Sequence, residues 1–194
     1  MSTIAFSAIA SLDGYTVDAS GSFDWAAPDA DVHAFVNDLE RDVGTYVYGR
    51  RMYETMRVWQ TLTDDDDDTG VMADYADIWR GADKLVVSST LDEVTTPRTR
   101  LVRTFDAEAV RDLADASDRS VGIGGPTLAA EAFRAGIVDE VQLFVVPIAV
   151  GGGTPAFPLG LTVALDLVDE RRFAGGVVYL RYRVRREPGD PAAE

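Results

Sequence analysis

Three segments of the sequence combine residue types that can bind a phosphate group through the polypeptide backbone. They are "YVYGRR" (46–51), "LVVSST" (85–90) and "VGIGGPT" (121–127), and each passes from apolar residues directly into glycine, serine or arginine. Glycine has no Cβ, so a ligand can approach its backbone closely, and the N–H groups that begin a helix attract anions. The three segments therefore predict anion binding where strands end and helices begin.

The glycine pair Gly124–Gly125 precedes Pro126, a residue favoured in the first turn of a helix. The dinucleotide pattern GxGxxG would require glycine where Thr127 stands, and no acidic residue ends a strand about 20 residues later, so the standard Rossmann motif is excluded. A phosphate that approaches the bare backbone is one interpretation of this segment. A tight turn that only requires positive φ is the other.

Arg50 and Arg51 follow Gly49 at the predicted start of a helix, where the helix dipole disfavours cations. An anionic ligand would explain both arginines, because the planar guanidinium group matches the geometry of phosphate. A surface ion pair in an acidic protein explains them as well. The hydroxyl groups of residues 88–90 could contact the same phosphate, although serine is common at strand ends.

The elements that position these segments alternate between strand and helix through the middle of the chain. Strands are predicted at 2–10, 45–49, 83–89, 99–104 and 119–125, over most of 138–153 and as a pair within 161–186; helices are predicted at 29–41, 50–59, 71–80, 106–116 and 126–136. This order predicts an α/β fold with a mixed, mostly parallel sheet and an antiparallel C-terminal strand pair. Ligands bind such sheets beyond the carboxyl ends of the strands.

The composition excludes several classes of site. The 194 residues include no cysteine and one histidine, His33, which excludes disulfides, thiolate zinc sites, cysteine nucleophiles and histidine-rich metal centres. We expect no metal, and we expect His33 on an exposed helix surface. The formal net charge of −15 opposes non-specific binding to nucleic acid or to an anionic membrane.

The chain has the size of one domain, which we place at residues 1–186. No apolar run approaches the roughly 20 residues that a membrane span needs, and the N-terminus lacks the basic region of a signal peptide. A cytoplasmic protein is therefore expected. The acidic run within 61–70 is predicted to be a solvated loop, and the tail 187–194 is predicted to be disordered.

Seven fragments, taken in order, resemble the dihydrofolate reductase-like family, specifically the reductase domain of bacterial riboflavin biosynthesis enzymes and its stand-alone relatives. They extend over residues 1 to about 186 and are "SLDGYTVD", "GSFDW", "VYGRRMYE", "LVVSST", "GIGGPTL", "PIAVGGGTPAF" and "VVYLRYRV". The resemblance implies a three-layer fold with helices on both faces of the sheet. It also implies an oxidoreductase that uses NADPH as hydride donor.

The resemblance assigns cofactor binding to Gly49, Arg50, Arg51, Ser88, Ser89, Gly124, Gly125, Pro126, Thr127 and Leu128. In the family, the Gly–Arg helix start binds the cofactor phosphates, and the serine pair lies beside the 2′-phosphate of the adenosine ribose. The glycine pair holds the pyrophosphate, often through a cis peptide bond, which would be Gly124–Gly125 here. The next three residues open a helix against the cofactor.

Around the nicotinamide, the resemblance places Asp13 and the loop that continues to Trp25. Asp31 stands four residues before Phe35, the spacing at which folate reductases carry the acid that helps to protonate the pterin. Asp13 and Asp31 are therefore the predicted catalytic residues, although Asp31 could equally serve only to stabilise the helix dipole. Trp25, Gly151 and Gly152 are predicted to contact the substrate, with a flexible strand connection as the alternative for the two glycines.

The expected acceptor is a small heterocycle reduced at a CH–OH or CH–NH type group. The first candidate is 5-amino-6-(5-phosphoribosylamino)uracil, and dihydrofolate or another pterin is the second. Riboflavin-pathway enzymes usually carry proline and arginine before the central strand and extra basic residues for the ribose phosphate, whereas "RGADKLVV" stands here. A non-catalytic NADPH-binding module and a purely structural protein are the competing hypotheses, and the family resemblance implies a homodimer.

Overall fold

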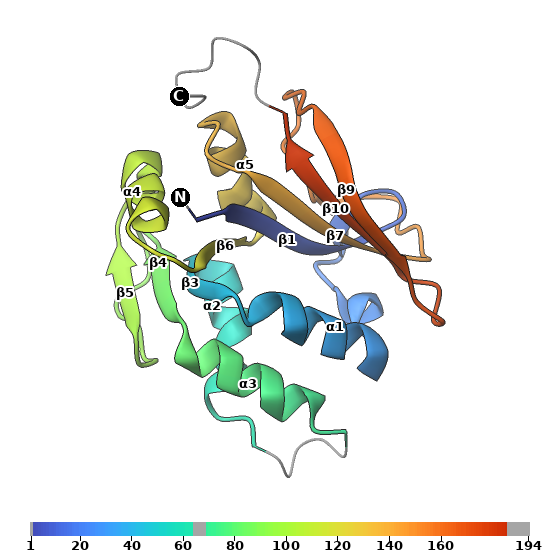
Figure 1. The fold of residues 1–194 in the computed structure, drawn as a ribbon, viewed down its shortest axis with the longest axis horizontal. Coiled ribbons are helices and arrows are strands. Elements are labelled where there is room, and N and C mark those ends of the chain that lie inside the picture. Colours follow the sequence, from blue (N-terminus) through green and yellow to red (C-terminus); the bar gives the residue numbers. More distant parts are fainter. Residues whose placement is uncertain (1, 64–68, 186–194) are drawn as a thin grey trace.

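The computed structural model describes residues 2–63 and 69–185 of the chain. Its centre is an eight-stranded sheet with the strand order β5-β4-β3-β6-β1-β7-β10-β9 (Figure 1). Its strands are β1 (Ile4–Ser11), β3 (Val43–Gly49), β4 (Asp83–Val87), β5 (Thr99–Val102), β6 (Ser120–Gly124), β7 (Glu140–Val146), β9 (Leu165–Arg172) and β10 (Val178–Val184). The predicted loop at 61–70 lies partly, and the predicted disordered tail wholly, outside the described residues.

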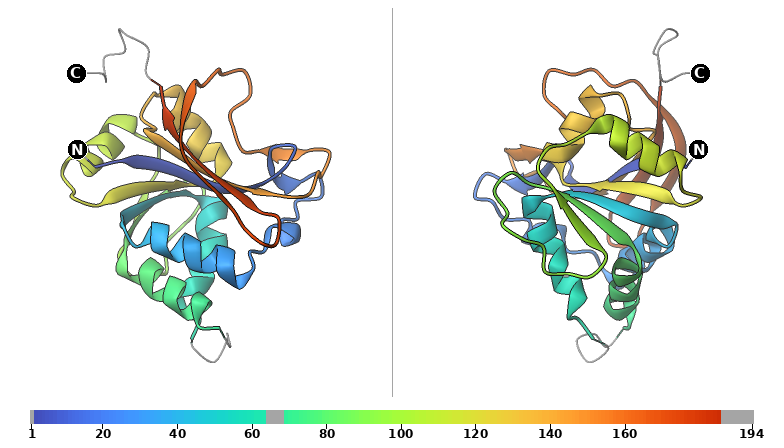
Figure 2. Two further views of the ribbon diagram at one scale, coloured as in Figure 1. Left: turned by 45° about the vertical axis from the view of Figure 1, so that its right-hand side comes forward. Right: turned by 90° about the vertical axis from the view of Figure 1, so that its left-hand side faces the viewer.

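The sheet is parallel from β5 through β7 and antiparallel at β10 and β9. Helices cover both of its faces, with α1, α2 and α3 on one face and α4 and α5 on the other (Figures 1 and 2). They are α1 (Ala30–Glu40), α2 (Arg50–Met56), α3 (Val71–Gly81), α4 (Ala107–Asp115) and α5 (Pro126–Arg134). The predicted three-layer α/β class and the antiparallel C-terminal pair are confirmed.

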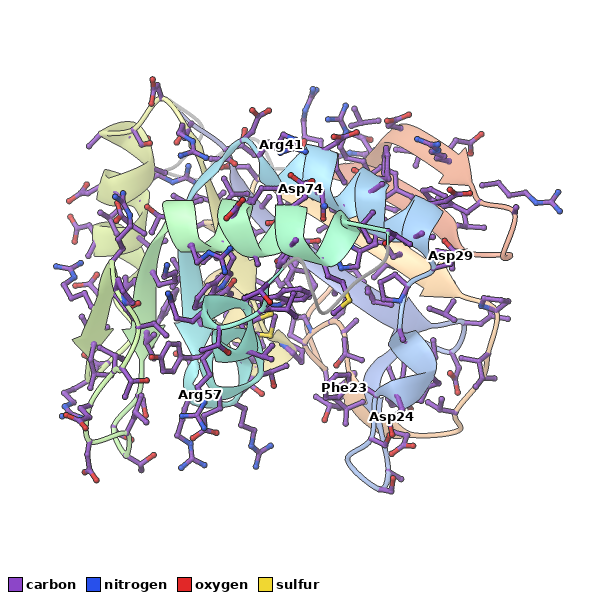
Figure 3. The ribbon with its side chains drawn as sticks, turned by 90° about the horizontal axis from the view of Figure 1, so that it is seen from below. Phe23, Asp24, Asp29, Arg41, Arg57 and Asp74 are labelled. Atoms are coloured by element: carbon purple, nitrogen blue, oxygen red, sulfur yellow. The ribbon has the colours of Figure 1, made fainter. Side chains whose placement is uncertain are left out.

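Each helix layer buries its own apolar core against the sheet. Phe133 of α5 packs edge-to-face on Phe6 of β1, and Trp79 of α3 is fully buried beneath β3 and β4. Fully burying one such side chain contributes about 1.5–3 kcal/mol. The polar pair Arg41–Asp74, at 2.8 Å, joins α1 to α3 (Figure 3).

Two short strands beside the main sheet escape the sequence prediction. β2 (Tyr15–Asp18) pairs with β8 (Gly153–Pro155) although more than 130 residues separate them in the chain. Glycine and aspartate around β2, and glycine and proline around β8, predict only loops. The pair lies beyond the carboxyl end of β1 (Figure 2), where it ties the loop after β1 to the loop after β7.

Helix ends follow the side chains that cap them. Asp29 accepts a hydrogen bond from Val32 N and so caps the start of α1, and Asp106 caps α4 in the same way. The predicted helix at 50–59 is α2 followed by a 3-10 turn, η2 (Arg57–Gln60). His33 is not on an exposed surface as expected, because its ring is half-buried and packs edge-to-face on Trp59 and Tyr75.

Candidate functional site

The predicted phosphate-binding segments lie side by side at one edge of the sheet. Gly49 at the end of β3 is in register with Val87 at the end of β4, and Tyr48 is in register with Gly124 at the end of β6. A Cβ added to Gly49 would lie 3.9 Å from Leu128 Cβ in the first turn of α5. The carboxyl ends of three neighbouring strands and the starts of two helices therefore meet there.

The two helices that start at this edge have no side-chain cap. α1 and α4 are capped by aspartates, whereas α2 begins after Gly49 and α5 after Gly125 without a capping side chain, as α3 does after Gly70. Pro126, at the start of α5, has no N–H, and the next backbone donors belong to Thr127 and Leu128. Uncapped first-turn donors fit an anionic group such as a pyrophosphate.

The expected cis peptide bond between Gly124 and Gly125 is wrong. The described residues contain no cis peptide bond, so this bond is trans. Gly125 instead turns the chain from β6 into α5 with a φ of 90°, a conformation that only glycine adopts at low cost. Gly125 therefore has the positive φ that the tight-turn interpretation requires. The same segment also begins α5 at the carboxyl ends of the strands, as the phosphate interpretation requires.

Gly124 leaves no room for a side chain. A Cβ there would lie 2.5 Å and 2.7 Å from atoms of the buried Tyr48 ring. We expect Gly124→Ala to lower the free energy of unfolding by about 1–3 kcal/mol, as other overpacked cores do. Gly81→Ala is the matched control, because a Cβ on Gly81 meets nothing within 4 Å and should be neutral or stabilising. Urea unfolding would measure both, and equal stability of the two variants would contradict this packing.

Of the two predicted serines, only Ser89 exposes its side chain. The Ser88 hydroxyl is buried and accepts hydrogen bonds from Thr90 N at 3.2 Å and Leu91 N at 2.9 Å, so it shapes the turn after β4. Arg103, directly after β5, donates to the carbonyls of Ser88 and Leu91. Sequence reasoning missed Arg103, although its place at the carboxyl end of a predicted strand was a usable signal.

The paired arginines differ in their surroundings. Arg50 lies 3.9 Å from Glu54 on the next turn of α2, a weak contact at an exposed position. Arg51 is exposed and forms no salt bridge within the described part of the chain. The ion-pair interpretation therefore explains Arg50 in part and leaves Arg51 available to an anionic ligand.

Asp13 joins the loop after β1 to the glycine loop after β7. Its carboxylate accepts hydrogen bonds from Ser11 Oγ at 2.6 Å, Gly151 N at 2.7 Å and Val150 N at 3.1 Å. The Ser11 hydroxyl, followed by the backbone donors, holds the pKa of Asp13 below its usual value. Asp13 is therefore ionised at neutral pH, and its oxygens are occupied in ordering Gly151 rather than placed to donate a proton.

The other predicted residues near the nicotinamide lie on two further elements. Trp25 belongs to a 3-10 turn, η1 (Asp24–Ala26), and its indole N–H is buried without an acceptor among the described residues. Asp31 is exposed in the first turn of α1. Phe35, one turn later, packs against Phe144 and Tyr179 within the protein. The structure leaves the catalytic role of Asp31 as a prediction.

A surface hollow of about 390 Å³ lies between η2 and Thr95–Thr96, with Arg57 in its wall. No predicted site residue lines this hollow. Among the described residues, no group of three or more histidine, cysteine, aspartate or glutamate side chains could hold a metal ion. No helix in the described part of the chain has the length and apolar character to cross a membrane.

A family model described as the RibD C-terminal domain matches residues 2–179. The chain belongs to this family. A curated relative, the "Uncharacterized protein YyaP" of Bacillus subtilis strain 168, is 25% identical over 173 residues, which are 88% of this chain and 89% of the relative. The match extends over all the predicted site residues, from Asp13 to Gly152.

Solved structures share the fold. A putative riboflavin biosynthesis protein from Shewanella sp. PV-4 is 23% identical with a TM-score of 0.71, over 96% of this chain and all of that one. A pyrimidine reductase-like protein from Corynebacterium diphtheriae is 18% identical with a TM-score of 0.66, over 96% and 93% of the two chains. A bifunctional deaminase and reductase from Thermotoga maritima is 15% identical with a TM-score of 0.65, and the match covers 95% of this chain and 57% of that protein.

Proposed function

We propose that this RibD C-terminal domain protein is a reductase that uses NADPH to reduce a small heterocyclic compound. The observation that carries the proposal is the pair of uncapped helix starts, α2 and α5, at neighbouring strand ends. Arg51 and Ser89 are exposed near these helix starts, and Arg103 follows the next strand end. Family membership supports the same function, because structures with this fold carry names such as 5-amino-6-(5-phosphoribosylamino)uracil reductase.

The proposal divides the edge of the sheet into two parts. The ends of β3, β4 and β6 would hold the cofactor phosphates through the first-turn N–H groups of α5 and through Arg50, Arg51 and Ser89. Bound NADPH would supply the hydride from C4 of its nicotinamide. The loops after β1 and β7, joined by Asp13 and Gly151, would then face the nicotinamide and the acceptor.

Two carboxylates have different roles in this proposal. Asp13 orients the glycine loop, because its oxygens accept hydrogen bonds from Gly151 N and Val150 N. Asp31 is exposed and its carboxyl group accepts no hydrogen bond among the described residues, so it is the better candidate to supply the proton that accompanies hydride transfer. Trp25 would contact the acceptor from η1.

Cofactor oxidation with a panel of acceptors tests the proposal directly. The panel includes 5-amino-6-(5-phosphoribosylamino)uracil, which family resemblance favours, together with dihydrofolate and other pterins. The proposal expects loss of nicotinamide absorbance with at least one of them. A protein that binds NADPH and oxidises it with none would favour the non-catalytic module, and absence of NADPH binding would contradict both.

Asp31→Asn separates a proton-supplying role from a structural one. We expect turnover to fall by about 10²–10⁴-fold, the usual contribution of a positioned acid. The affinity for NADPH should stay nearly unchanged, because Asp31 lies on α1 and not at the starts of α2 or α5. Asp38→Asn, an exposed aspartate later in α1, is the control. Steady-state kinetics measure the effect, and unaltered turnover in Asp31→Asn would remove this residue from the mechanism.

We also propose that the protein is a homodimer that pairs through β9. This strand is the last in the sheet, so the outer backbone N–H and C=O groups of β9 have no neighbouring strand among the described residues, and its Leu167 and Val168 are exposed. Light scattering of the intact protein should give the dimer mass. Leu167→Lys should shift the population to monomer, whereas Val58→Lys, at an exposed apolar residue of η2, should not. A wild-type monomer at micromolar concentration would contradict the proposal.

A further inference from the structure

Charge is unevenly distributed along the edge of the sheet that holds the proposed site. The chain contains no lysine or arginine at residues 1–40 or at residues 135–170. These two segments provide β1, β7 and the loops that follow them. The arginines at the edge, at positions 50, 51 and 103, all come from the part of the chain that forms β3 to β5 and the residues next to them.

The two segments without cations form one continuous part of the site. Leu12 N donates to Ile148 O at 2.7 Å, Gly151 N donates to Asp13, and Ala156 N donates to Gly14 O at 2.9 Å. The β2–β8 pair continues the same junction. Anything that binds beside Asp13 and Gly151 therefore meets a surface built from both segments, and η1 in the first segment lies against β1.

The charged side chains that these two segments contribute to this surface are carboxylates, and the arginine beside the start of α1, Arg171 of β9, stacks on Phe35 and Phe173. Asp13, Asp24 and Asp31 are exposed, and none of them forms a salt bridge within the described residues. Asp24 lies on η1, and Figure 3 shows it apart from Arg57, which lies to its left on η2. A phosphate group here would meet negative charge and no arginine or lysine of these segments.

Large apolar side chains are exposed on the same surface. Leu12 is 71% exposed, Phe23 48% and Ile148 38%. Leu12 and Ile148 lie on the two joined loops, and Phe23 lies directly before η1 (Figure 3). Exposed apolar residues that gather beside a proposed site are typical of ligand contacts.

We infer that the acceptor reduced by this protein carries no phosphate or carboxylate and is a neutral or cationic heterocycle with an apolar face. The inference rests on the proposed function and specifies its substrate class. The cationic part of the edge then binds the cofactor phosphates, and the part around Asp13 binds the acceptor, which carries no negative charge. A phosphoribosyl compound is the excluded class, and a pterin without its glutamate tail is an example of the accepted class.

Two matched pairs of compounds test the inference on the protein saturated with oxidised cofactor, NADP⁺. One pair is 5-amino-6-ribosylaminouracil and its 5′-phosphate, and the other is dihydroneopterin and its monophosphate. Titration calorimetry should show that the phosphate weakens binding by about tenfold or more in the pair that binds. The difference should shrink as salt is added, because exposed charges are screened.

Charge reversal provides the second arm of the experiment. Asp24→Lys should improve binding of the phosphorylated compound by about fivefold or more relative to its uncharged partner. Asp115→Lys makes the same change of charge on α4, in another part of the fold, and should alter neither. Tighter wild-type binding of a phosphorylated compound, or binding of none of the four, would overturn the inference. Failure to bind NADP⁺ would instead overturn the proposed function on which it rests.

Discussion

Replacing Arg50 and Arg51 together by alanine is expected to weaken NADPH binding by roughly tenfold to a hundredfold. This range corresponds to the loss of one hydrogen-bonded contact between a charged group and a phosphate, about 1.5–3 kcal/mol. NADH lacks the 2′-phosphate, so its binding should weaken less. The two arginines begin α2 beside the uncapped start of α5, where their only described ion pair is the 3.9 Å contact of Arg50 with Glu54.

The matched control removes the same charge from elsewhere. Arg134 at the end of α5 and Arg183 in β10 are both exposed, and their joint replacement by alanine changes the net charge equally. This control should alter the affinity for NADPH by less than threefold or so, because charges farther than a Debye length are screened. Equal losses for NADPH and NADH in the Arg50/Arg51 variant would contradict the 2′-phosphate role. An equal loss of NADPH affinity in the control variant would show that the effect comes from net charge alone.

Glu40 is expected to make the protein less stable as the pH rises from about 4.5 to about 7. This residue ends α1 and is buried, and burial raises the pKa of its carboxyl group to about 7 from an ordinary 4.5. The Tyr46 hydroxyl partly opposes the shift without forming a hydrogen bond of normal geometry, and Tyr75 of α3 also faces the carboxyl. The folded protein therefore keeps a proton that the unfolded chain releases.

The difference in proton binding between the folded and unfolded states sets the direction and the size of the change in the free energy of unfolding. Between the two pKa values the unfolded chain binds fewer protons, so the free energy of unfolding falls as the pH rises. The full loss is roughly 3 kcal/mol and is complete above the folded-state pKa. Glu40→Gln should remove this slope, and Glu131→Gln, at an exposed position of α5, should keep it. Urea unfolding across this pH range measures both, and identical slopes in the wild type and Glu40→Gln would contradict the assignment.

Much of the fold could be predicted because its signals are local. The alternation of strands and helices, the capping aspartate Asp29 and the Pro126 helix start each depend on a few neighbouring residues. β2 and β8 could not be predicted, because neither has a strand pattern of its own and each is stabilised by a partner more than 130 residues away. Whether such short strands form depends on their tertiary contacts.

The sequence predicts which segments form the candidate site, but it predicts the roles of their individual side chains less well. The glycine junctions mark the correct edge of the sheet, but the sequence does not reveal that Gly125 uses a positive φ with a trans peptide bond. Ser88 has the residue type of a ligand contact, yet its hydroxyl closes a turn. Burial of Glu40 depends on aromatic residues from β3 and α3, which lie apart from it in the chain.

The most direct test of the account is a crystal structure of the protein with bound NADPH. The account predicts that the pyrophosphate lies within hydrogen-bond distance of the backbone N–H groups of Thr127 and Leu128. The 2′-phosphate should lie beside Ser89 and Arg51, and the nicotinamide should lie toward the loop that Asp13 joins to Gly151. A cofactor bound in the hollow beside Arg57, away from the starts of α2 and α5, would contradict the account.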